Sequence, residues 1–241
     1  MPDTLPEGPL GGRIAYVTGS SRGIGAATAK ALAAAGAHVL ISGRTVADLE
    51  AVEDSIHEAG GTATIAPFDL TEGDAIARLA TAVAERWGKL DILVLNAAML
   101  PALSPVTQID QKEFNRALTL NVLATQTLLA AFDPLLKRSD AAHVVGVTSS
   151  VGSAPRAYWG AYGASKAAFE VLLDCYGQEV EKISSTRVAI VDPGATRTLM
   201  RARAYPGEDP QSVKAPEVVA DRILSLLREG FSTGHRERIS A

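Results

Sequence analysis

The chain has 241 residues, 47% of them apolar, and a formal net charge of −4, so it is long enough for one domain with a sizeable core. Its mixed acids and bases form no basic stripe, so nucleic acid is not an expected partner. No apolar run approaches the roughly 18 residues of a membrane helix, and the start lacks a secretory signal. We therefore expect a cytoplasmic protein with no membrane partner.

The cysteine and histidine residues indicate neither a disulfide nor a metal site. Cys175 is the single cysteine, and the four histidines are far apart along the chain. Metal sites built from such side chains usually show short, repeated spacings. We therefore predict that the protein binds no metal.

The first dozen residues differ in composition from the rest. Residues 1–12 contain three prolines and three glycines, which is typical of a loosely held terminus. No linker or change of composition divides the remaining chain. We predict a flexible tail over residues 1–12 and a single domain over residues 13–241.

Short β-rich apolar runs alternate with longer helical patterns along this domain. The predicted strands are residues 14–18, 39–42, 62–66, 92–95, 143–148 and 187–191. The predicted helices are residues 24–35, 46–59, 72–87, 111–137, 159–182 and 216–228. Buried strands separated by crossover helices are typical of a parallel sheet between two helical layers. The sequence therefore predicts the α/β class, with a doubly wound, Rossmann-like sheet in three layers.

A glycine-rich turn follows the first predicted strand. Thr18 and Gly19 begin it, and Gly23 and Gly25 complete a Gly-x-x-x-Gly-x-Gly spacing where a helix starts. Such glycines let the backbone approach a pyrophosphate, and the helix directs its N-terminal amides toward the negative charge. The alternative is a turn that only needs flexible residues.

A phenol and an ammonium group lie one helical turn apart, at Tyr162 and Lys166. Tyrosine ordinarily titrates at about 10. Its use as an acid or base near neutral pH requires a stabilised phenolate, which a neighbouring lysine could partly supply. The spacing also arises by chance, so its meaning depends on the surrounding motifs.

Together, the glycine turn and the Tyr-x-x-x-Lys pair resemble the single-domain branch of the short-chain dehydrogenase/reductase family, over residues 13–228. The resemblance implies an oxidoreductase that interconverts a carbonyl and a secondary alcohol by hydride transfer. It implies Tyr162 as general acid and base, and Lys166 as the group that lowers the tyrosine pKa. It also implies Ser149 as the substrate-binding hydroxyl and Asn121 as the residue that distorts its helix and holds a proton-relay water. Ser150 misses the family's spacing by one, so Ser149 is the better candidate.

The resemblance also implies a cofactor-binding set at the ends of the predicted strands. Asp69 is expected at the adenine, and the segment after residue 192 is expected at the nicotinamide. The full set is Gly19, Ser21, Arg22, Gly23, Ile24, Gly25, Arg44, Asp69, Leu70, Asn96, Ala97, Tyr162, Lys166, Pro193, Gly194, Thr196 and Thr198.

Two arginines favour NADP(H) over NAD(H). Arg44 follows the second predicted strand, where an acid would bind the ribose 2′-hydroxyl and a base would accept a 2′-phosphate. Gly43 leaves room there, and Arg22 adds a second charge. A guanidinium can bind phosphate through two N–H groups. The alternative is that Arg44 stacks on adenine and Arg22 is solvated, so that NAD(H) is also accepted.

Three features depart from the family's pattern. Leu95 stands where an asparagine is usual, and Ala98 where a glycine is usual. The extra methyl of Ala98 would narrow the nicotinamide site unless the local backbone dihedrals are ordinary. The segment after Gly230 is short, although residues 236–240 could form an edge strand. Apolar surface on the helices 111–137 and 159–182 predicts a homodimer or homotetramer.

The expected substrate is a small, largely apolar carbonyl compound. The expected pocket residues are Met99, Leu100, Tyr158, Trp159 and Met200, and the stretch 199–215 resembles the family's segment that closes over substrate. Reduction of 3-oxoacyl groups on acyl carrier protein is one alternative. A regulatory or scaffold protein that binds NADP without catalysis is another. An epimerase or dehydratase is a third, although its glycine spacing is shorter.

Overall fold

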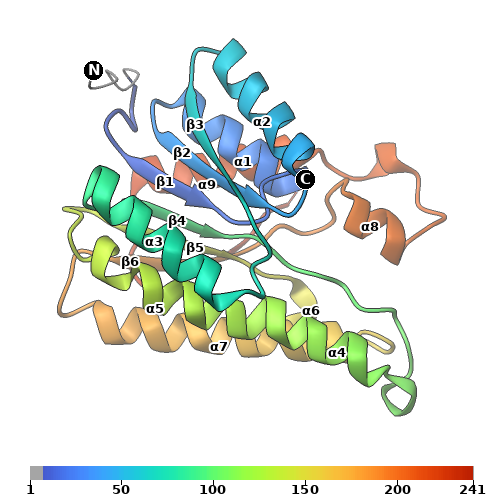
Figure 1. The fold of residues 1–241 in the computed structure, drawn as a ribbon. Helices are drawn as coiled ribbons and strands as arrows, with labels where there is room; N and C mark the ends of the chain where they lie inside the picture. Colours follow the sequence, from blue (N-terminus) through green and yellow to red (C-terminus); the bar gives the residue numbers. More distant parts are fainter. Residues whose placement is uncertain (1–7, 241) are drawn as a thin grey trace.

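The computed structural model describes residues 8–240, which form one parallel sheet with helices on both faces (Figure 1). Within these residues the sheet has the strand order β3-β2-β1-β4-β5-β6-β7, and all neighbouring strands are parallel. The predicted doubly wound, Rossmann-like fold is confirmed. The strands are β1 (Ile14–Val17), β2 (His38–Gly43), β3 (Thr62–Pro67), β4 (Ile92–Leu95), β5 (His143–Val147), β6 (Arg187–Asp192) and β7 (His235–Arg238).

Two helical layers enclose the sheet, and each has its own apolar core. The first layer contains α1 (Gly23–Ala34), α2 (Val46–Glu58) and α9 (Pro216–Glu229). The second contains α3 (Gly73–Trp87), α5 (Ala124–Leu136) and α7 (Gly160–Val180). The remaining helices are α4 (Gln111–Leu118), α6 (Ser150–Ser153) and α8 (Leu199–Ala204).

The core explains why the predicted elements form where they do. Each central strand is a short run of residues that are apolar on both faces, as a sheet covered on both sides requires. Leu32 of α1 and Leu49 of α2 are buried against one face, and Phe132 of α5 and Phe169 of α7 against the other. The predicted strand bounds agree within one residue. Five of the six predicted helices agree within two residues.

The sixth predicted helix, over residues 111–137, is wrong as a single regular element. α4 ends at Leu118, a π-helical segment spans Thr119–Leu123, and α5 continues from there. Asn121 lies in the middle of this segment and is 1% exposed. A π-helical insertion shifts the following side chains around the helix axis and often marks a functional site. The side chain of Asn121 makes three hydrogen bonds from this segment, described below.

β7 closes one edge of the sheet beside β6. Its sequence, His-Arg-Glu-Arg, lacks the apolar residues that normally predict a strand. Ion pairs hold it instead: Arg222 bonds Glu237 at 2.8 Å, and Arg236 bonds Glu170 of α7 at 2.6 Å. The strand spans residues 235–238, whereas the predicted range is 236–240. It therefore begins one residue earlier and ends two residues earlier than predicted.

The end of the predicted N-terminal tail and the start of the stretch 199–215 both make local hydrogen bonds. Residues 1–7 of the predicted N-terminal tail lie outside the described residues. From Gly8 to Gly12 the chain forms turns, Leu10 is buried, and its N–H bonds the carbonyl of Ala35. In the stretch 199–215 the structure contains α8, whose N-terminal amide at Arg201 bonds the Thr198 hydroxyl.

No helix within residues 8–240 is both long and apolar enough to cross a membrane. The same residues contain no cluster of three or more histidine, cysteine, aspartate or glutamate side chains that could hold a metal ion.

Candidate active site

The glycine turn between β1 and α1 lies at the carboxyl edge of the sheet, where the strand order reverses between β1 and β4. Gly19 and Gly23 have φ angles of +63° and +57°, which other residues adopt only at a cost in energy. A Cβ on Gly19 would also lie only 2.9 Å from the Cα of Ala97. Both glycines are therefore required by the backbone and by close packing.

Side-chain hydrogen bonds attach this turn to the end of β4. The hydroxyl of Thr18 accepts bonds from the N–H groups of Asn96 and Ala97, each at 3.0 Å. The amide of Asn96 donates to the carbonyls of Thr18 at 2.9 Å and Gly19 at 3.1 Å. These bonds hold the backbone of the turn in place at the N-terminus of α1, an arrangement that suits a pyrophosphate.

The two departures after β4 are compatible with this geometry. Leu95 is 2% exposed and packs in the core of the second helical layer. Among residues 8–240 Tyr158 is the only non-glycine residue with positive φ. Ala98 therefore has an ordinary backbone conformation, and its methyl group causes no strain.

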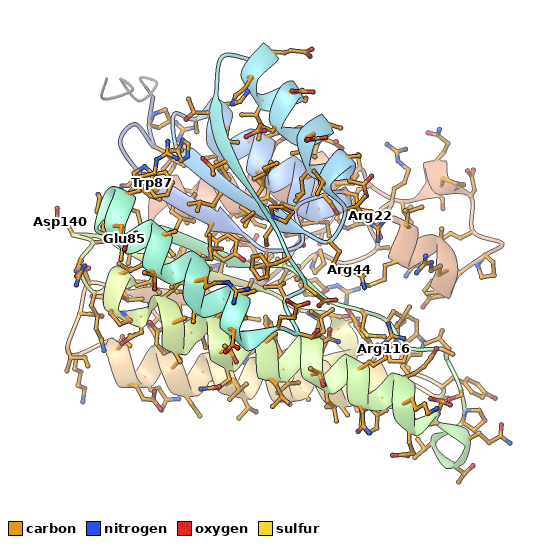
Figure 2. All side chains as sticks on the ribbon, in the orientation of Figure 1. Arg22, Arg44, Glu85, Trp87, Arg116 and Asp140 are labelled. Carbon is orange, nitrogen blue, oxygen red and sulfur yellow. The ribbon has the colours of Figure 1, made fainter. Side chains whose placement is uncertain are left out.

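Arg22 and Arg44 are both exposed and lie on the same side of the molecule (Figure 2). They come from different elements, the glycine turn and the end of β2. A Cβ on Gly43 would lie 3.2 Å from the Cβ of Ser21, so these two elements are in contact. The guanidinium of Arg44 is 4.0 Å from the carboxylate of Asp69, after β3. This edge therefore presents two positive charges, one of them weakly paired.

The remaining cofactor-binding candidates surround the same edge. Ile24 packs partly against the core of the first layer, and Leu70 is buried in the second. Gly194 has a φ of +62° after β6. The hydroxyl of Thr196 donates to the carbonyl of Pro193 at 3.0 Å. Thr198 begins α8 beside the glycine turn, where a Cβ on Gly23 would lie 3.4 Å from its methyl group.

Tyr162 and Lys166 lie one turn apart on α7 and are 6% and 2% exposed. The hydroxyl of Tyr162 is 3.8 Å from the sulfur of Met200. Burial raises the pKa of Tyr162, and the negative charge of Asp192 raises it further. The phenol is therefore protonated at neutral pH.

Lys166 makes its own contacts at the end of β5. Its ammonium donates to the carbonyl of Val147 at 2.8 Å and lies 4.5 Å from the ring centre of Phe169. Burial lowers the pKa of Lys166 to about 8, against the opposing charge of Glu170. The pKa of Tyr162 is raised rather than lowered, because desolvation and Asp192 determine it.

Asn121 connects the segment after β4 to α7. Its carboxamide accepts from the N–H of Met99 at 2.9 Å and donates to the carbonyl of Met99 at 3.0 Å. It also donates to the hydroxyl of Ser165 at 2.9 Å, and Ser165 donates to the carbonyl of Tyr162 at 2.8 Å. The carboxamide of Asn121, in the middle of the π-helical segment, thus bonds both the segment after β4 and α7.

A cavity of about 170 Å³ opens next to Ser149 and Ser150, beyond the ends of β5 and β6. Ser149 directly precedes α6, and the carbonyl of Ser150 accepts from the hydroxyl of Ser153. The lining residues are Ser149, Ser150, Val151, Arg156, Trp159, Asp192, Gly194, Ala195, Arg201, Tyr205 and Arg238.

This lining differs from the expected apolar pocket. Trp159 is present, but Met99, Leu100, Tyr158 and Met200 are not part of it. Arg156, Arg201 and Arg238 were missed, because they are distant in sequence and belong to no recognisable motif. Only the folded chain brings them to one place.

The chain belongs to the short chain dehydrogenase family, whose family model matches residues 13–209. It is 37% identical over 221 residues to the oxidoreductase YciK of Escherichia coli K12, covering 90% of this chain and 87% of that protein. A short chain dehydrogenase structure from Pseudomonas syringae superposes with a TM-score of 0.92 at 40% identity, covering 97% of this chain and 98% of the other. A structure from Escherichia coli CFT073, complexed with NADPH, has a TM-score of 0.88 at 36% identity, covering 97% and 99%. The predicted family is confirmed.

Proposed function

We propose that the protein is an NADP(H)-dependent oxidoreductase that interconverts a carbonyl compound and a secondary alcohol. One observation carries the proposal: Tyr162 and Lys166 are buried on one turn of α7, at the carboxyl edge of a dinucleotide-binding sheet. The ring of Trp159, which lines the cavity beside Ser149, is 6.1 Å from the ring of Tyr162. A substrate in that cavity would therefore lie near a proton donor.

The residues at the sheet edge fit NADP(H). The glycine turn presents backbone at the N-terminus of α1 for the pyrophosphate, and the exposed guanidinium of Arg44 is available to a ribose 2′-phosphate. The structural relative from Escherichia coli CFT073 was solved with NADPH. When bound, the nicotinamide supplies a hydride to the carbonyl carbon or accepts one from the alcohol carbon.

The chain's own residues manage the proton and the oxygen. In reduction, the phenol of Tyr162 donates its O–H proton to the substrate oxygen, which becomes the alcohol hydroxyl. Ser149 donates a hydrogen bond to the same oxygen and stabilises its developing negative charge. We propose that the charge of Lys166, one helical turn from Tyr162, stabilises the phenolate that is left after proton transfer. Asn121 bonds both the segment after β4 and Ser165 of α7. We propose that it also supports the relay water that returns a proton.

Replacement of Tyr162 by phenylalanine tests the proposal. The Tyr162→Phe variant should bind NADPH normally and lose turnover of any carbonyl substrate by at least about 100-fold, since it lacks the acidic proton. Tyr176→Phe is the matched control, because it removes a hydroxyl from the same helix at a group that bonds Asp133. The control should retain turnover.

Before this comparison, the unmodified protein should be screened with NADPH for reduction of ketones, aldehydes and 3-oxoacyl thioesters. Equal turnover by Tyr162→Phe and the unmodified protein would refute the assigned proton donor. If the unmodified protein binds NADPH and reduces none of these classes, the binding-only scaffold becomes the better hypothesis.

We also propose that the protein is a homo-oligomer. Leu123 in the π-helical segment and Val171 on α7 are 60% and 59% exposed. Exposed apolar side chains on long helices favour pairing between subunits. Light scattering coupled to size exclusion tests this, and a monomeric mass at micromolar concentration would contradict it.

A further inference from the structure

Three guanidinium groups line the cavity beside Ser149, and they come from three different parts of the fold. Arg156 follows α6, Arg201 belongs to α8, and Arg238 ends β7. Each carries a full positive charge at any physiological pH. Such a concentration of positive charge costs free energy unless anions balance it.

Two of these charges are already balanced. Arg201 forms a two-pronged ion pair with Glu208, with its Nε 2.7 Å from the carboxylate, and it stacks 3.6 Å from the ring centre of Tyr205. Arg238 is 3.5 Å from the carboxylate of Asp192, whose other oxygen accepts from the N–H of Gly194 at 2.9 Å. These pairs fix the walls of the cavity.

Arg156 is the unbalanced charge. Its side chain is exposed and forms no ion pair with any other residue between positions 8 and 240. The only carboxylate in the cavity lining belongs to Asp192, which is engaged with Arg238 and Gly194. The cavity therefore keeps a net positive charge and lies open to an incoming anion.

Aromatic rings lie between the arginines and the proton donor, and they would determine the orientation of a bound substrate. The ring of Trp159 is 5.9 Å from that of Tyr205 on one side and 6.1 Å from that of Tyr162 on the other. A flat or slender substrate could lie along Trp159, with its carbonyl toward Tyr162 and Ser149. Its far end would then reach the arginines.

We propose, building on the function above, that the substrate carries an anionic group, a carboxylate or a phosphate, which Arg156 binds while the carbonyl lies at Ser149 and Tyr162. Arg156 would thus determine specificity rather than take part in proton or hydride transfer. The reduction itself is balanced as before: the carbonyl carbon gains a hydride, and its oxygen gains the proton of Tyr162.

Matched ketones test the inference. The probes are 4-acetylbenzoate, 4-acetylphenyl phosphate and the neutral methyl 4-acetylbenzoate, each with NADPH. The unmodified protein should show a kcat/KM at least about 10-fold higher for one of the anions than for the ester, as a charge-assisted hydrogen bond would give. The anion with the higher kcat/KM shows whether the anionic group of the substrate is a carboxylate or a phosphate.

Variants then assign the effect to Arg156. In Arg156→Gln the anion-to-ester ratio of kcat/KM should fall close to one, and in Arg156→Lys part of it should return. Arg203→Gln is the control, because Arg203 is an exposed charge on α8 outside the cavity lining. It should keep the unmodified ratio. An ester used as well as both anions, or a ratio that survives Arg156→Gln, would overturn the inference.

A binding measurement separates this inference from the proposed function. Calorimetric titration of 4-(1-hydroxyethyl)benzoate and its methyl ester into Tyr162→Phe loaded with NADP+ requires no turnover. The acid should bind more tightly than its methyl ester, and the added Arg156→Gln substitution should abolish this difference. That result supports the anion site, even if the unmodified protein reduces no ketone. Turnover without any Arg156-dependent preference in either measurement rejects the anion site alone.

Discussion

The carboxamide of Asn121 donates a hydrogen bond of 2.9 Å to the hydroxyl of Ser165, the residue that precedes Lys166 on α7. Both side chains are buried, at 1% and 0% exposure. The bond joins the irregular turn between α4 and α5 to the helix that carries Tyr162 and Lys166. The bond therefore helps to hold α7 against the neighbouring helix.

We expect Asn121→Ala to lower kcat by about 10- to 100-fold, since small misplacement of reacting groups has large effects on rate. It should also lower the free energy of unfolding by about 1–3 kcal/mol, because buried groups lose their partners. Steady-state kinetics and thermal unfolding measure both. Asn115→Ala, at an exposed position of α4, is the control and should change neither. An unchanged kcat in Asn121→Ala would contradict the positioning role.

Arg44→Ala should reduce the preference for NADPH over NADH. The guanidinium is exposed and only weakly paired with Asp69, so it is available to a 2′-phosphate. Loss of a charge-assisted bond should lower the ratio of kcat/KM values for the two cofactors by about 10- to 100-fold. Arg78→Ala, an exposed charge on α3, should leave the ratio unchanged. A preference for NADH in the unmodified protein would reject the phosphate site.

Lys166→Met should make the protein more stable and inactive. Burial lowers the pKa of Lys166 from 10.5 to about 8, so at neutral pH the folded chain holds an ammonium that water would solvate better. The unfolded chain binds this proton more tightly, and stability due to this group rises with pH between these two values. Removal of the charge should raise the free energy of unfolding by about 1–2 kcal/mol.

Urea unfolding at neutral pH measures the effect of Lys166→Met, and Lys182→Met provides an exposed control that should leave the stability unchanged. If Lys166→Met unfolds more easily than the unmodified protein, the bond from its ammonium to Val147 outweighs the desolvation.

The pH dependence of turnover should follow Lys166 in the direction of reduction. The raised pKa of Tyr162 keeps the phenol protonated, so the acid is available throughout the neutral range. As the pH rises through about 8, Lys166 loses the charge that stabilises the phenolate, and kcat should fall. Alcohol oxidation needs a deprotonated Tyr162 and should instead gain from higher pH. Rate profiles in both directions measure this.

Lys166→Arg is the control for this pH dependence, because a guanidinium stays charged. In that variant, the decrease in kcat for reduction should occur at a higher pH than in the unmodified protein. A profile identical to that of the unmodified protein would assign the fall to another group.

Much of the fold could be predicted because its signals are local. The central strands are apolar on both faces, and Gly19 and Gly23 occupy positions where the backbone needs positive φ. The same holds for Tyr162 and Lys166, because a helix fixes their relative position once it forms. These features depend on a few neighbouring residues, so a pattern in the sequence suffices.

The rest depends on contacts between distant segments. The sequence does not show that Lys166 donates a hydrogen bond to the carbonyl of Val147, 19 positions earlier, or that burial raises the pKa of Tyr162. Nor does it show that Asn121 bonds Ser165 and interrupts a helix. The positive cavity was missed for the same reason, since Arg156 and Arg238 meet only when β7 has joined the sheet.

The way β7 is held has a consequence for how the protein responds to dissolved electrolyte. Attraction between partly exposed charges weakens as ions accumulate around them, whereas apolar burial does not. We therefore expect concentrated sodium chloride to loosen β7, at the edge of the sheet, before the inner strands β1 and β2. Since Arg238 lies on that strand and lines the cavity, salinity should affect substrate capture more than melting temperature.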